Sequence, residues 1–173
     1  MTLPRSFTLL LLALACHHRA DTTPDTTVPG LDALRAATRP FTELDSAVAA
    51  GYARDVANCL VHEHHGAMGY HHTNPQFMDA TVDVARPEIL LYERLSSGEY
   101  RLNGVEFIVP YRGWPRDSTP PSVMGQTMLR EENLQFWYLH VWAWTPNPDG
   151  LFANFHPEVS CAPESSRVFR PSS

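Results

Sequence analysis

Three side chains in separate parts of the chain have the types that bind a transition metal or transfer protons: His71, Glu106 and His140. Two imidazoles and one carboxylate form a ligand set that leaves open positions on zinc or iron. A buried His–Glu pair can also bring the pKa of the imidazole close to neutral pH, which makes His140 and Glu106 the candidates for acid–base catalysis. Both chemistries require these side chains to meet on one face of the fold.

The region Cys59–Pro75 holds five of the nine histidines, but their spacing matches no zinc motif. In the run HEHHG, Gly66 stands where the H-E-x-x-H motif of zincins needs its second histidine. The chain has no C-x-x-C pair, which excludes a structural thiolate zinc site of that kind. The HEHHG histidines are most simply a polar exit from a helix. His71 and His72 are adjacent, so a strand would direct only one of them, taken here as His71, toward a site.

Alternation along two predicted strands positions Glu106 and His140. Around Glu106 the odd positions are Val105, Phe107 and Val109; in Leu134–Trp144 the even positions are Phe136, Tyr138, His140, Trp142 and Trp144. Glu106 and His140 would therefore share a face with apolar neighbours, where an unpaired carboxylate is costly. Tyr138, Trp142 and Trp144 would line a ligand-binding pocket. The alternative is an ion pair on a half-exposed face, with the tryptophans filling a second core layer.

The elements expected around these residues are one helix and several strands. Leu44, Val48, Tyr52 and Val56 recur every fourth residue, which predicts a helix from about Thr42 to Val61. The stretches 86–95 and 100–111 read as a hairpin around SSGE, and 134–144 reads as a further strand. The sequence therefore predicts an α+β fold, with one long N-terminal helix packed on a small antiparallel sheet of about four strands.

The N-terminus has the pattern of a secretory signal. An apolar run follows Arg5, is too short to span a bilayer, and ends in ALAC at Cys16. This pattern is similar to the bacterial lipoprotein signal, so Cys16 is the expected lipidation site; the alternative is an ordinary signal peptide. We expect a signal peptide at 1–15, a flexible lipid-anchored tether at 16–39, a single domain at 40–163 and a loose tail at 164–173. The domain would face the periplasm or the exterior of a bacterial cell envelope.

The remaining cysteines, Cys59 and Cys161, form an even pair in an oxidising compartment. We expect a disulfide between them; the alternative is two buried thiols. Such a bridge would close a loop of about a hundred residues, for which the chain-entropy model gives at most about 4.7 kcal/mol.

The charge pattern excludes several functions. The formal net charge is −6, and all 13 basic residues are arginine. Without lysine there is no Schiff-base chemistry and no P-loop. The absence of a basic stripe argues against nucleic-acid binding.

Five segments of the chain also resemble one family. They are GAMGYHHTN, RPEILLYE, LNGVEFIVPY, LHVWAWTPNPDGLF and HPEVSC. Together they resemble a family of small secreted and lipoprotein bacterial proteins whose activity is uncharacterised. The resemblance implies that His71, Glu106 and His140 belong to one module, and it implies no substrate or cofactor.

These observations favour a lipid-anchored extracytoplasmic domain that binds a small ligand or a metal ion, zinc or iron, in an aromatic pocket around His71, Glu106 and His140. The partners would be the membrane, through the lipid, and a small molecule. One alternative is a metal-dependent or acid–base enzyme that uses the same residues. The other is a structural envelope lipoprotein without pocket chemistry.

Overall fold

A computed structural model describes residues 28–161 and 166–168, with the backbone alone for 54–58 and 166–168. The predicted signal peptide, Cys16, the first part of the tether and most of the tail lie outside the described residues. In chain order the elements are α1 (Leu31–Thr38), the 3-10 helix η1 (Arg39–Thr42), α2 (Leu44–Ala49), β1 (Ala53–His62), β2 (Gly66–Thr73), the 3-10 helix η2 (Pro75–Phe77), β3 (Ile89–Arg94), β4 (Tyr100–Pro110), β5 (Ser122–Val123), β6 (Gln126–Thr127), β7 (Leu129–Glu131), β8 (Phe136–Val141) and β9 (Ser166–Val168). None of the helices in this part of the chain has the length and hydropathy to cross a bilayer.

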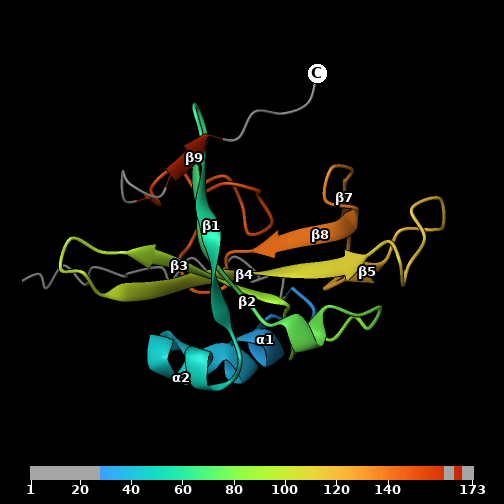
Figure 1. Cartoon of the computed structure of the whole chain (residues 1–173), viewed down its shortest axis with the longest axis horizontal. Helices are drawn as coiled ribbons and strands as arrows, with labels where there is room; N and C mark the ends of the chain where they lie inside the picture. Colours follow the sequence, from blue (N-terminus) through green and yellow to red (C-terminus); the bar gives the residue numbers. More distant parts are fainter. Residues whose placement is uncertain (1–27, 162–165, 169–173) are drawn as a thin grey trace, which may run out of the picture.

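Most strands belong to one curled sheet with the order β7-β8-β4-β3-β2-β1-β9. Its first six strands pair antiparallel, and the short β9 joins β1 in parallel. The short helices α1 and α2 lie together on one side of this sheet, and β1 runs across the direction of β3 and β4 (Figure 1). The prediction of one long helix on about four strands is therefore wrong: the protein is mostly strand.

The predicted helix from Thr42 to Val61 breaks at Gly51. The Gly51 N–H donates to the Val48 carbonyl at 3.0 Å, which closes the last turn of α2. Gly51 has a φ of 96°, which glycine adopts without strain, and the chain then continues into β1. The residues that recur every fourth position do not form the buried face of α2, because Val48 is 54% exposed whereas Ala47 is fully buried. The period of four therefore did not mark a buried helix face.

The helical segment begins earlier than predicted. Leu34 of α1 is fully buried in the main core, so the domain boundary expected at residue 40 falls inside the helical segment. Thr38 accepts a hydrogen bond at 3.0 Å from the indole nitrogen of Trp144, and Arg35 donates to the Ala143 carbonyl at 2.8 Å. These contacts join α1 to the chain that leaves β8.

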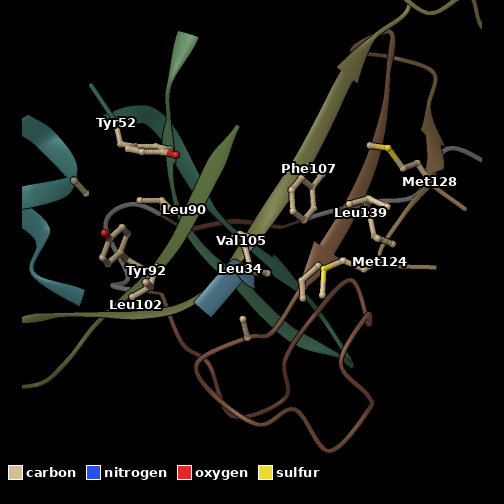
Figure 2. Packing of buried hydrophobic residues seen from close by; sticks show 14 of the residues in the cluster. Leu34, Tyr52, Leu90, Tyr92, Leu102, Val105, Phe107, Met124, Met128 and Leu139 are labelled. Atoms are coloured by element: carbon tan, nitrogen blue, oxygen red, sulfur yellow. The ribbon is translucent and has the colours of Figure 1, made fainter. Parts of the chain in front are cut away.

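The strands predicted from alternation are present. The stretches 86–95 and 100–111 contain the hairpin β3–β4, and 134–144 contains β8. From Val105 onward in β4, and throughout β8, the odd positions face the main core together with side chains from α1 and from β3, as Figure 2 shows. The residues labelled there are Leu34, Tyr52, Leu90, Tyr92, Leu102, Val105, Phe107, Met124, Met128 and Leu139. Before Val105 the register of β4 shifts by one residue at Asn103, so Leu102 faces the core as well. The even positions of β8, and those of β4 from Glu106 onward, therefore face the opposite side of the sheet.

After β8, residues 142–161, here called the return segment, first contact α1 through Ala143 and Trp144 and then reach β2 and β1 through His156 and Cys161. The chain crosses close to Gly104 of β4, where an added Cβ would lie 2.4 Å from the Val141 carbonyl oxygen. A larger residue at position 104 would push β8 away, so this glycine permits the close crossing. Further along, His156 and Ala67 of β2 exchange backbone hydrogen bonds of 2.9 and 3.1 Å.

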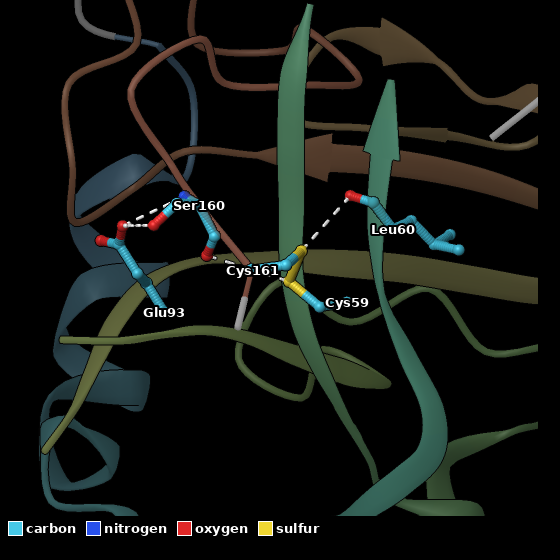
Figure 3. Close-up of a disulfide and its surroundings, with 5 residues drawn as sticks. All are labelled: Cys59, Leu60, Glu93, Ser160 and Cys161. Atoms are coloured by element: carbon cyan, nitrogen blue, oxygen red, sulfur yellow. Dashed lines mark hydrogen bonds between the residues drawn. A yellow bond between two sulfur atoms is a disulfide. The ribbon is translucent and has the colours of Figure 1, made fainter. Parts of the chain in front are cut away.

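The predicted disulfide between Cys59 and Cys161 is confirmed. Their Cα atoms are 5.6 Å apart, and the bridge joins β1 to the end of the return segment (Figure 3). Beside it, Glu93 of β3 accepts hydrogen bonds from the backbone and hydroxyl of Ser160 at 3.1 and 3.4 Å. Arg101 donates to the other Glu93 oxygen at 2.5 Å. Cys59 therefore lies on the strand β1, where the sequence predicted the end of a helix.

Candidate metal centre

The three residues predicted to form the site come together from different strands. His71 lies on β2, Glu106 on β4 and His140 on β8. Glu106 and His140 are directly paired across β4 and β8. β3 separates β2 from β4, and it presents Leu91 opposite His71. The site therefore exists only because the sheet order places β4 beside both β3 and β8.

One ligand atom from each of the three side chains lies within 4.8 Å of the other two. The Nε2 atom of His71 is 3.5 Å from Glu106 Oε2, and the Nε2 atom of His140 is 3.6 Å from Glu106 Oε1. The two imidazole rings are almost perpendicular, with their centroids 6.5 Å apart. The carboxylate therefore lies between two imidazoles, each presenting a nitrogen to one of its oxygens.

All three residues are buried, with exposures of 8% for His71, 6% for Glu106 and 1% for His140. Burial raises the pKa of Glu106 to about 8, and the nearby carboxyl groups of Glu88 and Glu131 act in the same direction. Without a compensating positive charge, the site therefore favours a protonated Glu106 at neutral pH.

His140 is the least solvated of the three. Burial lowers its pKa to about 3, and the neighbouring His71 lowers it further; a polar interaction with Asn154 opposes part of the shift. Neither ring nitrogen of His140 has a hydrogen-bond partner among the residues that the structure describes. A neutral imidazole with available nitrogens is the form that binds metal.

The three aromatic residues predicted to line a pocket lie in different surroundings. Tyr138 lies beside the site, with its ring centroid 5.6 Å from that of His140. Trp142 packs against Ala67 and Val159. Trp144 packs on the edge of the main core, because regular pairing of β8 ends at Val141. The strand predicted from the sequence ran three residues further, to Trp144, and therefore placed Trp144 on the face of His140 and not against the main core.

The other histidines of the region Cys59–Pro75 lie elsewhere. His72 points to the main core, where its ring is 4.8 Å from that of Tyr92. His62, His64 and His65 lie at the turn between β1 and β2, not at a helix exit. In this turn the Nδ1 atom of His62 accepts a hydrogen bond from the His64 N–H at 3.1 Å. Adjacent histidines thus face opposite sides of the sheet, as the alternation of a strand requires.

Glu88 is a buried carboxyl group near the site that the sequence did not single out. It is 2% exposed, and its Oε2 atom accepts a hydrogen bond from the Ile108 N–H at 2.9 Å. Burial raises the pKa of Glu88 to about 8, although the hydrogen bond from Ile108 opposes the shift. Its position just before β3 offered no apolar alternation from which burial could be inferred.

This shift predicts how stability depends on pH. Because the folded pKa of Glu88 lies above its ordinary value of 4.5, its contribution is fully present below pH 4.5 and is lost as the pH rises through about 8. The free energy of unfolding should fall between these values by up to about 1.4 kcal/mol per pH unit for each such proton. Glu88→Gln keeps an acceptor for Ile108 but has no proton to lose, so the dependence should become shallower. Urea unfolding from pH 5 to 8, with a chelator present, measures both slopes.

The exposed Glu99 provides the control, since Glu99→Gln should leave the wild-type slope unchanged. Equal slopes for Glu88→Gln and the wild type would show that Glu88 does not hold its proton above its ordinary pKa in the folded protein.

Comparisons of the chain with protein-family models, with curated proteins and with solved structures find no match. The site is therefore interpreted from its own geometry.

Proposed function

We propose that the protein is an extracytoplasmic metal-binding domain, and that His71, Glu106 and His140 bind one zinc ion. The observation that carries this proposal is the convergence of two buried imidazoles on one buried carboxylate. This is the donor set of three-ligand zinc sites, in which water or a substrate takes the fourth position. It also serves non-haem iron, which makes iron the alternative metal.

The separations are compatible with zinc after a small movement of the side chains. Bonds of about 2.0–2.1 Å to a tetrahedral ion place neighbouring ligand atoms about 3.3 Å apart. The two His–Glu separations of 3.5 and 3.6 Å end on different oxygens of the carboxylate, and the three ligand atoms lie within 4.8 Å of one another, so binding would draw them closer together. Both His–Glu separations are longer than a good hydrogen bond, so the carboxylate is not saturated by the histidines that flank it.

The burial of the residues also supports a cation at this place. A buried carboxylate is unfavourable unless it is paired or coordinates a metal, and a divalent ion supplies the missing charge. It would also give His140 a partner that the described residues do not provide. The same burial favours metal binding over the enzymatic alternative, because a substrate would have to reach ligand atoms on residues at most 8% exposed.

The proposed location is the outer face of a bacterial membrane, with lipid on Cys16. Its support is the ALAC sequence that follows an apolar run, together with the Cys59–Cys161 disulfide, which is typical of proteins outside the cytoplasm. We also propose that the chain belongs to the family of small secreted and lipoprotein bacterial proteins that it resembles. In that family the pattern from GAMGYHHTN to HPEVSC would preserve the same site.

Metal analysis of protein purified from periplasm without a histidine tag tests the proposal. We expect about one zinc per chain after incubation with zinc and removal of loosely bound metal. His140→Ala and His71→Ala should each remove most of it, because two protein ligands bind zinc much more weakly than three. Parallel incubation with iron(II) distinguishes the two metals.

The matched control is the double variant His64→Ala/His65→Ala, which removes two exposed imidazoles and leaves the site intact. It should keep the wild-type zinc content. A wild-type protein that retains neither zinc nor iron, or whose metal is lost in the control and kept in His140→Ala, would contradict the proposal.

A further inference from the structure

Asn154 lies on the return segment, between two points where the backbone is fixed. On one side, the indole nitrogen of Trp142 donates to the Ala153 carbonyl at 2.6 Å. On the other side, the Asn147 amide donates to the Phe155 carbonyl at 2.8 Å. Because both neighbouring carbonyls are bound, the backbone around Asn154 is held on both sides.

The Asn154 side chain contacts the surroundings of the metal centre. Its Nδ2 atom donates to the Tyr138 hydroxyl at 3.2 Å, and the Tyr138 ring packs edge-on to His140. This hydrogen bond uses the donor side of the amide and leaves its carbonyl oxygen available. Through the Tyr138 ring, Asn154 is therefore linked to the part of the sheet that holds His140.

His140 needs an acceptor at this place if it binds metal. Its Nε2 atom faces Glu106, so Nδ1 carries the proton when Nε2 coordinates. A metal-bound histidine almost always donates its other N–H to a carboxylate or carbonyl oxygen, which fixes the tautomer and the orientation of the ring. Nδ1 of His140 is buried, and it has no hydrogen-bond partner among the described residues.

We infer that Asn154 is the positioning residue of the metal centre: its carbonyl oxygen accepts the Nδ1 proton of His140, while Tyr138 holds the amide in place. This inference rests on the proposed function, since it assigns a role in metal binding. It makes the return segment part of the site, although that segment contributes no metal ligand.

The test is the zinc affinity of the full-length protein, measured by competition with a chromophoric chelator. Asn154→Ala should weaken zinc binding by about 10- to 100-fold, the usual effect of losing such a partner. Asn154→Asp should keep the affinity within about threefold of wild type, because a carboxylate accepts the same proton and the Tyr138 hydroxyl can donate to it. Cobalt(II) in place of zinc should show altered visible bands in Asn154→Ala alone, since these report ligand geometry.

Thr145→Val is the matched control. It removes a side-chain hydrogen bond of the same segment, from the Thr145 hydroxyl to Asn103 Oδ1 at 2.7 Å, and leaves the contacts of Asn154 in place, so it should lower stability and leave zinc affinity unchanged. If Asn154→Ala does not fold, Tyr138→Phe takes its place in the test. Loss of the hydroxyl that holds the Asn154 amide should weaken zinc binding by less than the loss of Asn154 itself. An unchanged zinc affinity in Tyr138→Phe would overturn the inference.

The outcomes separate the two proposals. If the wild type binds zinc and Asn154→Ala binds it equally well, or no worse than Thr145→Val, the positioning role is wrong and the zinc site stands. If the wild type binds no zinc, the proposed function fails and the positioning role fails with it.

Discussion

Replacing both cysteines of the disulfide, in Cys59→Ser/Cys161→Ser, should lower the free energy of unfolding by up to about 4.7 kcal/mol. The bridge spans 102 residues, so it closes a loop that contains most of the sheet, and its loss frees that loop in the unfolded chain. The folded state also loses the covalent link between β1 and the end of the return segment. With typical domain stabilities of about 5–15 kcal/mol, this loss is between about a third and nearly all of the free energy of unfolding. Urea unfolding of oxidised wild type and variant gives the difference directly.

Reduction of the wild type is the control for this prediction. Reduced wild type and the double serine variant should unfold at similar urea concentrations, because both lack the same bridge. Neither treatment changes Glu93 or Ser160, so a loss of stability shared by the reduced wild type and the double variant is assigned to the disulfide. If the free energy of unfolding of the double variant lies within about 1 kcal/mol of that of the oxidised wild type, the prediction is wrong. The bridge would then constrain the unfolded chain only weakly, as happens when the bridge strains the folded state or when the unfolded chain retains structure.

Strand alternation was the sequence signal that predicted the site best. Along β4 and β8 it separated the core residues from Glu106 and His140, and the register pairs these two residues directly. It also indicated that only one of His71 and His72 could reach the site. These inferences needed only the local rule that successive side chains change face. They did not need the order of the strands.

The errors arose where local pattern competed with a turn or with long-range pairing. One residue, Gly51, ends α2, and the residues after it form β1, although the apolar period suggested a continuous helix. The pairing of β4 with β8 joins segments separated by more than twenty residues, which no local period reveals. Asn154 was missed for a related reason: it lies outside any strand, and its position depends on hydrogen bonds from Trp142 and Asn147.

Replacing Glu106 by glutamine should remove zinc binding and leave the metal-free protein as stable as the wild type or more stable. Glu106 is 6% exposed, so the ionised form of its carboxyl group is unfavourable without a cation, whereas an amide of the same shape can be buried as a neutral group. Zinc at about 100 times its dissociation constant should stabilise the wild type by about 2.7 kcal/mol and Glu106→Gln by almost nothing. Urea unfolding with chelator and with zinc, at one pH, measures all four values.

A variant that is at least as stable as the wild type in chelator but less stable than the wild type in zinc identifies Glu106 as a residue kept for binding at a cost in stability. A purely structural Glu106 predicts the reverse: Glu106→Gln would lose stability in chelator, and zinc would change neither protein. The exposed Glu158 serves as the control, since Glu158→Gln should match the wild type in both conditions. If zinc stabilises Glu106→Gln as much as the wild type, the ion binds elsewhere in the chain, and the three buried side chains need another explanation.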